Sequence, residues 1–231
     1  MRVNAGRLTV TIAVWSVKGG VGVTSVAAML AIARVERAEP TVLVDLCGDL
    51  PALLGGHDLD KTDAAPGITD WCATPELAVT ALARIERPVR TDLTIVPRGT
   101  GLLSADAAPL LQALGLSQRR VIVDCGVVTE RHDFRRQFVA AAPVSLLVVR
   151  ECFLNLRAAQ ANLVTPTAVI VVKEPGRHLG RADVEAVTGA PVVAQVAVDP
   201  SIARSLDAGL ASARLPRSLL RVLGRVPLDV V

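Results

Sequence analysis

Short apolar runs alternate along the chain with segments of helical composition. The apolar runs are rich in β-branched residues and carry few polar positions, which is typical of strands buried on both faces of a sheet. Strands are therefore predicted at Leu8–Trp15, Thr41–Asp45, Asp92–Val96, Arg120–Asp124, Val144–Val149, Ala168–Val172 and Val192–Val196. Helices are predicted at Ser25–Arg37, Ala105–Leu114, Asp133–Ala141, Asn155–Leu163, Arg181–Thr188 and Ile202–Leu206. This alternation predicts an α/β fold, with a doubly wound, mostly parallel sheet flanked by helices.

The length and the spread of apolar residues indicate one domain. The 231 residues contain no repeat, low-complexity tract or linker that would divide them. We therefore predict a single domain over residues 1–231, with a loop or switch-like segment at Gly55–Pro66. No apolar run approaches the roughly 18 residues that a membrane span needs. No signal peptide is recognised at the N-terminus. Together these features predict a cytoplasmic protein.

The spacing of the cysteines argues against two kinds of site. The four cysteines are isolated from one another, which argues against a metal-binding cysteine motif and against a disulfide framework. The net charge is +3, and the only lysines among the 25 basic residues are Lys18, Lys61 and Lys173. Two explanations of this arginine bias are open: the base composition of the genome, or arginine patches that bind nucleic acid.

A glycine-rich segment follows the first predicted strand and opens the first long helix. It reads Lys18-Gly19-Gly20-Val21-Gly22-Val23-Thr24-Ser25. Glycines allow positive φ angles and let backbone N–H groups approach an anion closely. The helix N-terminus adds aligned donors and a partial positive charge. The strand–loop–helix context therefore predicts a phosphate-binding loop rather than a simple turn.

This segment resembles the deviant Walker A motif of the ParA/MinD superfamily, KGGVGK[TS][TS]. The resemblance implies that Lys18 reaches across a dimer to the partner's phosphates and that Thr24 binds Mg²⁺. It also implies nucleotide contacts from Gly19, Gly20, Gly22 and Ser25. Val23 stands where the motif has its second lysine, which normally contacts the β- and γ-phosphates. Valine supplies no charge and no hydrogen-bond donor there.

The resemblance continues at two later strand ends. The stretch ending in Asp45 and Cys47 resembles the family's switch I, commonly D-x-D, whose second aspartate positions the attacking water. Cys47 replaces that aspartate, and Asp49 is a candidate substitute if the loop takes a different path. Asp124 resembles the Walker B aspartate on the Mg²⁺ side, and its alternative role is to cap the strand end. Lys173 stands where relatives often have an asparagine that reads the adenine edge.

Three departures at separate points of the pocket predict a degenerate ATPase. The resemblance then implies a ParA/MinD-like positioning or scaffold protein with impaired or absent ATP hydrolysis, as in TadZ/CpaE-like proteins of pilus and secretion loci. Such a protein would organise a pilus or secretion assembly, division or partition. It would form a homodimer, bind ATP and Mg²⁺ weakly or not at all, and recruit a protein partner. The alternative is a slow but active ATPase that dimerises on ATP and binds nucleoid DNA or membrane.

Two arginine-rich segments are candidate binding surfaces. Residues 214–226 place Leu215, Leu219, Val222, Leu223 and Val226 on one helical face flanked by arginines. MinD-like relatives carry a membrane-binding helix at this position, so the segment is either a peripheral membrane contact or a terminal helix packed on the domain. Arg131, Arg135 and Arg136 form the second cluster. It fits non-specific DNA binding, a solvated helix face or a dimer interface.

Overall fold

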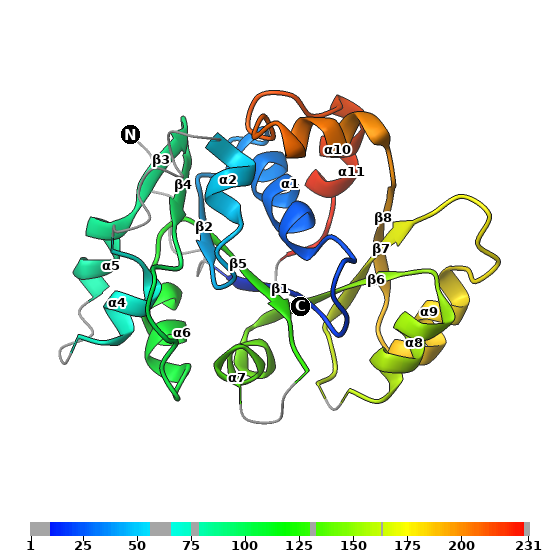
Figure 1. The fold of residues 1–231 in the computed structure, drawn as a ribbon, viewed down its shortest axis with the longest axis horizontal. Coiled ribbons are helices and arrows are strands. Elements are labelled where there is room, and N and C mark those ends of the chain that lie inside the picture. Colours follow the sequence, from blue (N-terminus) through cyan, green and yellow to red (C-terminus); the bar gives the residue numbers. More distant parts are fainter. Residues whose placement is uncertain (1–9, 56–65, 75–78, 130–132, 163, 229–231) are drawn as a thin grey trace, which may run out of the picture.

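One mixed β-sheet carries all the strands of the described residues, which are 10–55, 66–74, 79–129, 133–162 and 164–228 of this computed structural model. The strands are β1 Thr11–Ser16, β2 Thr41–Asp45, β3 Arg87–Arg90, β4 Leu93–Val96, β5 Arg120–Val127, β6 Val144–Arg150, β7 Ala168–Lys173 and β8 Val192–Ala197. Their order is β3-β4-β2-β5-β1-β6-β7-β8 (Figure 1). Neighbouring strands are parallel except for β3 and β4. The predicted fold class is confirmed.

Two strands depart from the sequence prediction. β3 was not predicted because it has only one β-branched residue, and its Pro88 is tolerated at the sheet edge. β5 runs to Val127 instead of ending at Asp124, because a register shift opposite β1 pairs Gly126 with Trp15. The extension carries β5 alongside the end of β1, directly before the glycine-rich loop.

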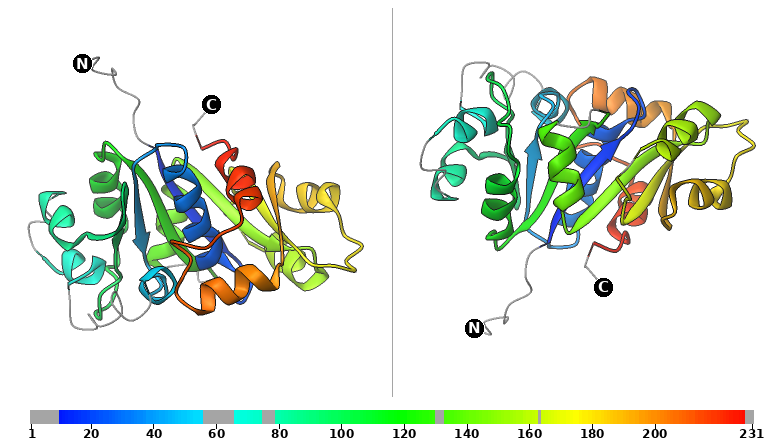
Figure 2. Two further views of the ribbon diagram at one scale, coloured as in Figure 1. Left: turned by 90° about the horizontal axis from the view of Figure 1, so that it is seen from above. Right: turned by 90° about the horizontal axis from the view of Figure 1, so that it is seen from below.

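Among the described residues, four helices cover one face of the sheet, which is the upper face in Figure 1 and the near face in the left view of Figure 2. They are α1 Val23–Val35, α2 Leu50–Gly55, α10 Pro200–Asp207 and α11 Arg217–Gly224. Ile12 and Val14 of β1 point into this layer, where they join one core cluster with Leu30 of α1 and Leu223 of α11. The long α1 lies at the centre of the layer because nearly all its residues are buried.

In the described part of the chain, six helices cover the opposite face. They are α4 Ile68–Cys72, α5 Val79–Ile85, α6 Ala108–Gly115, α7 Phe134–Ala141, α8 Phe153–Gln160 and α9 Arg181–Thr188. Ala13 and Trp15 alternate along β1 with Ile12 and Val14, so their side chains point to this opposite face. There they join a second core cluster with Phe138 and Val184. The buried indole N–H of Trp15 donates to Ser145 Oγ at 2.8 Å, so this bulky side chain leaves no unsatisfied donor.

Several predicted boundaries move or fall outside the described residues. α1 starts at Val23 rather than Ser25, because the Val26 N–H already bonds to the Gly22 carbonyl at 2.9 Å. α2, α4 and α5 were not predicted, since five to seven residues are too few for a helical period to show. Most of the loop predicted at Gly55–Pro66, and the ends of the predictions at Leu8 and Leu163, lie outside the described residues. None of the described helices has the length and apolarity that crossing a membrane requires.

Candidate functional site

The glycine-rich loop has an open, cradle-like backbone at the carboxyl end of β1. Gly20 and Gly22 adopt φ angles of 76° and 94°, in the left-handed region that favours glycine. Lys18, Gly19 and Gly20 are exposed, while Val21 is buried beneath them. Gly22 is the residue before the first turn of α1, so the N–H groups of that turn face the same side as the loop. The backbone is therefore shaped to receive an anion.

A pocket of about 480 Å³ lies against this loop. It is lined by Lys18, Gly20, Val21, Gly22, Val23, Thr24, Cys47, Asp49, Gly126, Val127, Thr129 and Arg135. Gly19 and Ser25, which are predicted nucleotide contacts, do not line this pocket. The structure thus brings together the loop, the loop after β2 and the end of β5 around one pocket.

Val23 forms part of the pocket wall without contributing charge. Its side chain is 6% exposed and packs in the core cluster of the upper face with Val21 and Val26. The valine therefore fills a core position, and the pocket in front of the loop stays open.

Asp45 shapes the loop after β2. Its side chain is fully buried. Oδ1 accepts hydrogen bonds from Cys47 N at 2.8 Å and Gly48 N at 2.7 Å, and Oδ2 accepts one from Leu50 N at 3.1 Å. Burial raises the pKa of Asp45, and these three backbone donors lower it. Both oxygens of the carboxylate are thus held by the backbone.

Cys47 occupies the position predicted for the missing aspartate and is packed tightly. Its Sγ lies 3.8 Å from the Asp124 carbonyl oxygen, and a Cβ on Gly126 would lie 2.4 Å from that sulfur. Burial raises the pKa of the Cys47 thiol, and the neighbouring Asp124 and Asp45 raise it further. The thiol is therefore neutral near pH 7, and no negative charge replaces the aspartate. Asp49 is exposed and lines the pocket two residues later.

Asp124 is the buried carboxylate with an unsatisfied oxygen in this pocket region. Its Oδ1 accepts from Gly126 N at 3.0 Å, whereas Oδ2 has no hydrogen-bond partner within the described part of the chain. Burial raises the pKa of Asp124 to about 7, against the lowering effect of the nearby Thr24 hydroxyl. One ligand atom each from Asp45, Cys47 and Asp124 lies within 4.8 Å of the others. Of these three groups, Asp124 offers the oxygen that a divalent cation would satisfy, because the Cys47 thiol is neutral and the Asp45 oxygens already accept backbone N–H groups.

Lys173 lies away from the loop pocket, and the arginine cluster is divided between two pockets. Lys173 is exposed at the end of β7, where its carbonyl accepts from Val198 N at 3.0 Å, and it does not line the loop pocket. The arginine cluster is split: Arg135 lines the loop pocket, and Arg136 lines a separate one beside Val17 and Asn162. Arg131 lies outside the described residues. The sequence gives no signal that Arg135 turns toward the loop.

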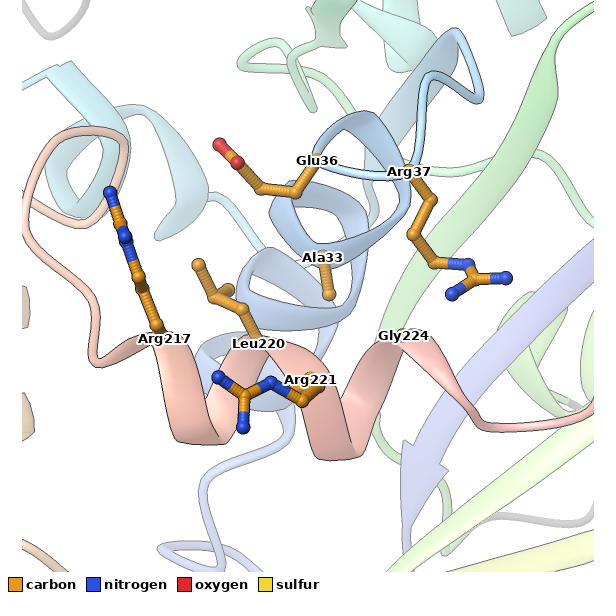
Figure 3. A pocket seen from close by; sticks show the side chains of 7 residues that line it. All are labelled: Ala33, Glu36, Arg37, Arg217, Leu220, Arg221 and Gly224. Carbon is orange, nitrogen blue, oxygen red and sulfur yellow. The ribbon is translucent and has the colours of Figure 1, made fainter.

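The helix within residues 214–226 is α11, and its apolar face is buried on α1. Leu219 and Leu223 are buried, whereas Val222 is 43% exposed. A groove of about 290 Å³ separates the outer edges of the two helices, and Figure 3 shows Arg217 and Arg221 along it. At Gly224 a Cβ would lie 3.0 Å from the Arg37 Cδ. Glycine therefore allows the close approach of the two helices.

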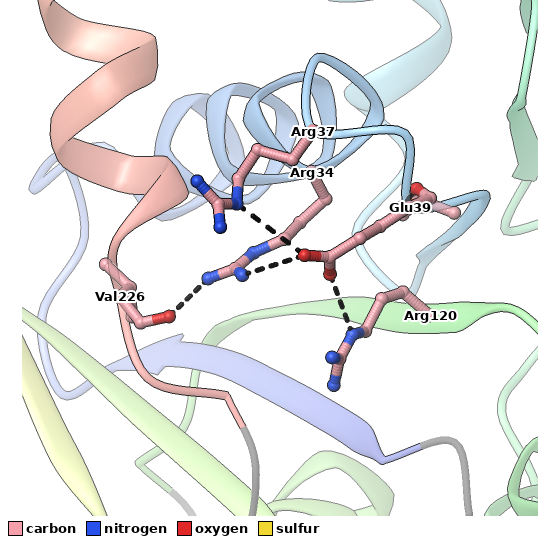
Figure 4. A network of polar contacts seen from close by, with 6 residues as sticks. Arg34, Arg37, Glu39, Arg120 and Val226 are labelled. Carbon is pink, nitrogen blue, oxygen red and sulfur yellow. Dashed lines mark hydrogen bonds and ion pairs between the residues drawn. The ribbon is translucent and has the colours of Figure 1, made fainter. Parts of the chain in front are cut away.

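Buried charge fixes the chain after α11. Arg34 of α1 is 5% exposed and donates to the Val226 carbonyl (Figure 4). Its guanidinium also lies 3.6 Å from Glu39, a carboxylate that Arg37 and Arg120 approach at 3.7 Å and 3.1 Å. The terminal segment is thus attached to the end of α1 that lies away from the phosphate loop.

Comparison with curated proteins gives relatives without a described function. No protein-family model matches the chain. Uncharacterized proteins from two strains of Mycobacterium tuberculosis are each 29% identical to it, over 94% of this chain and 63% of theirs. The chain thus spans less than two thirds of the length of these relatives.

Comparison with solved structures gives close matches in backbone. An ATP complex of McdA from Cyanothece has a TM-score of 0.73 at 17% identity, covering 96% of both chains. MinD from Pyrococcus horikoshii with Mg-ADP has a TM-score of 0.72 at 19% identity, covering 94% of both. MinD in a MinC:MinD complex from Aquifex aeolicus has a TM-score of 0.70 at 16% identity, covering 93% of this chain and 94% of that one. At these identities the likeness is one of fold.

Proposed function

We propose that this chain, which has the fold of the ParA and MinD ATPases, is a positioning or scaffold protein with impaired or absent ATP hydrolysis. One observation carries the proposal: the glycine cradle opens onto a pocket, while Val23 and Cys47 in its wall supply no charge. A pocket that keeps its shape suits a nucleotide that acts as a structural signal. We propose that the protein organises a cellular machine such as a pilus or secretion assembly, a division apparatus or a partition complex.

The energy of one lost phosphate contact supports weakened rather than abolished nucleotide binding. A charge-assisted hydrogen bond is worth roughly 1.5–3 kcal/mol, which corresponds to roughly ten- to a hundredfold in affinity. The backbone donors of the loop and the exposed Lys18 are still present. Hydrolysis is affected separately, because it needs a group that orients water, and the neutral Cys47 thiol and the backbone-bound Asp45 are poor candidates.

We propose Mg·ATP or Mg·ADP as the ligand of the pocket. The N–H groups at Gly20–Thr24 would hold the phosphates, and Thr24 and Asp124 would lie on the metal side. The unpaired Asp124 Oδ2 supports this assignment. When bound, Mg²⁺ supplies charge neutralisation for the phosphates. This chain's own groups would orient the nucleotide.

The alternative function is a slow but active ATPase that dimerises on ATP and binds nucleoid DNA or membrane. It is favoured by Asp49, an exposed carboxylate that lines the same pocket as Lys18. If Asp49 orients water, Asp49→Ala should lower phosphate release at least tenfold. Asp207→Ala is the matched control, since Asp207 is also exposed but ends α10, outside the pocket. Equal rates in both variants would remove Asp49 from the reaction.

Phosphate release under a Mg·ATP titration tests the main proposal. We expect saturable nucleotide binding in calorimetry, with release no faster in the wild type than in Lys18→Ala. Robust turnover in the wild type that Lys18→Ala abolishes would overturn the scaffold proposal and favour the active enzyme.

We also propose a homodimer formed through the carboxyl edge of the sheet. Leu102, Phe153 and Leu154 are 89%, 68% and 59% exposed and follow the ends of β4 and β6 on this edge. Phe153 and Leu154 are adjacent in the chain, and an exposed apolar patch is typical of an association surface. Phe153→Asp should then shift sedimentation toward the monomer. Leu116→Asp is the control, because Leu116 is 66% exposed but precedes β5 at the other edge. A dimer unaffected by Phe153→Asp would place the interface elsewhere.

A further inference from the structure

The loop pocket contains a second cation besides Lys18. Arg135, in the first turn of α7, lines the same pocket as Val23 and Thr24. Its neighbour Arg136 does not line this pocket, although the two are adjacent in sequence. The pocket thus combines a loop that has no lysine at Val23 with an arginine from a different element.

The guanidinium of Arg135 is held in position by the residue that caps α7. Asp133 accepts from Arg135 N at 3.2 Å through Oδ1 and pairs with Arg135 Nε at 3.0 Å through Oδ2. The Arg135 side chain is 31% exposed, so the charge is partly shielded and still open to the pocket. Asp133 contacts the guanidinium through Nε, and the two Nη groups carry its remaining N–H donors.

The guanidinium lies beside Cys47 and Gly126. A Cβ on Gly126 would be 3.8 Å from Arg135 Nη1, and the Arg135 charge lowers the pKa of the Cys47 thiol against the effect of burial. Cys47 stands at the position that resembles the water-orienting aspartate of the ParA/MinD family. The guanidinium therefore forms part of the pocket wall together with Cys47 and Gly126.

We propose that Arg135 is the phosphate-binding cation that compensates for Val23, contacting the terminal phosphate of a nucleoside triphosphate. The inference rests on nucleotide binding in the proposed function and adds the residue that distinguishes triphosphate from diphosphate. A guanidinium binds phosphate through two parallel N–H groups, which an ammonium cannot reproduce. Arg135 would also link α7 to the bound nucleotide, because the same side chain pairs with Asp133, the N-cap residue of that helix.

Calorimetric titrations with Mg·AMPPNP and Mg·ADP test the inference. Arg135→Gln keeps a polar side chain and removes the charge. Arg135→Lys keeps the charge and removes the two parallel N–H groups of the guanidinium. We expect Arg135→Gln to weaken AMPPNP binding roughly ten- to a hundredfold and ADP binding by much less. Arg135→Lys should fall between it and the wild type. Arg136→Gln, the matched control, should stay within about twofold of the wild type for both ligands.

The outcomes separate the two proposals. Wild-type protein that binds neither ligand refutes the nucleotide pocket itself, and the role of Arg135 with it. Wild-type protein that binds AMPPNP with unchanged affinity in Arg135→Gln refutes the role of Arg135 alone. An equal loss for AMPPNP and ADP refutes the terminal-phosphate assignment. Thermal unfolding of each variant confirms that a loss of affinity is measured on folded protein.

Discussion

Gly126 and Cys47 touch so closely that a Cβ on residue 126 would lie 2.4 Å from the Cys47 sulfur. This contact joins the end of β5 to the loop that follows β2. Gly126 also has a φ of 59°, a conformation that side chains with a Cβ rarely adopt. The position therefore requires glycine for two reasons, steric and conformational.

Gly126→Ala should destabilise the fold. The new methyl group must displace the Cys47 side chain and hold a strained φ angle, for a cost of roughly 1–3 kcal/mol in the free energy of unfolding. Urea denaturation measures the change. Gly115→Ala is the control, since a Cβ there meets nothing within 4 Å. The double variant Cys47→Ala, Gly126→Ala should recover only the steric part. Full recovery would show that the φ angle costs nothing.

Val23→Lys restores the charge that the loop lacks. We expect Mg·AMPPNP affinity to rise roughly tenfold or more, because a lysine stem can follow the apolar wall and place its ammonium in the pocket. The free energy of unfolding should fall by roughly 1 kcal/mol as the buried valine is lost. Val23→Met is the control of similar length without charge. If both variants raise the affinity equally, the gain comes from packing rather than from charge.

Asp124 makes stability depend on pH in the cation-free protein. Its pKa is raised from 3.8 to about 7, so between these values the folded state binds more protons than the unfolded state. The free energy of unfolding should therefore fall as pH rises from 4 to 7, by at most roughly 1.4 kcal/mol per pH unit. Asp124→Asn should flatten this slope and be the more stable form at pH 8. Urea denaturation across this range checks the sign, and an unchanged slope would contradict it.

Arg34→Ala should release the segment after α11. The substitution removes the donor to Val226 and leaves an unpaired buried carbonyl, for a loss of roughly 1–3 kcal/mol in the free energy of unfolding. Trypsin should then cleave after Arg225 faster than in the wild type. Arg37→Ala is the control, because its side chain is 54% exposed and it pairs with the same Glu39 at a similar distance, 3.7 Å against 3.6 Å. Equal cleavage in all three proteins would show that Arg34 does not fix the segment.

Much of the fold follows from local patterns, and the closest contacts of the site do not. The apolar runs predicted seven of the eight strands, because strands buried on both faces have a strong compositional signal. The edge strand β3 carries arginines at both ends and lacks that signal. The extension of β5 to Val127 depends on a bulge opposite Trp15, and no local sequence feature marks such a pairing.

The site divides in the same way. The loop at Lys18–Thr24 and the strand ends at Asp45 and Asp124 are recognisable because each is contiguous in sequence. The hydrogen bonds of each carboxylate cannot be predicted from the residues next to it in the sequence. The three N–H groups that hold Asp45 and the empty side of Asp124 arise from the path of the chain in space. The same is true of Arg135, which reaches the pocket only because Asp133 caps α7 and pairs with its Nε.

Helix α1 links two distant parts of the described structure mechanically. Its first residue, Val23, stands in the wall of the loop pocket, and Arg34, one residue from its end, holds the terminal chain. A helix of 13 residues spans about 20 Å and resists bending over that length. The two ends therefore behave as one rod, and any sliding or rolling of α1 displaces both at once. Whatever sits in the pocket and whatever binds near α11 are connected by a single piece of secondary structure.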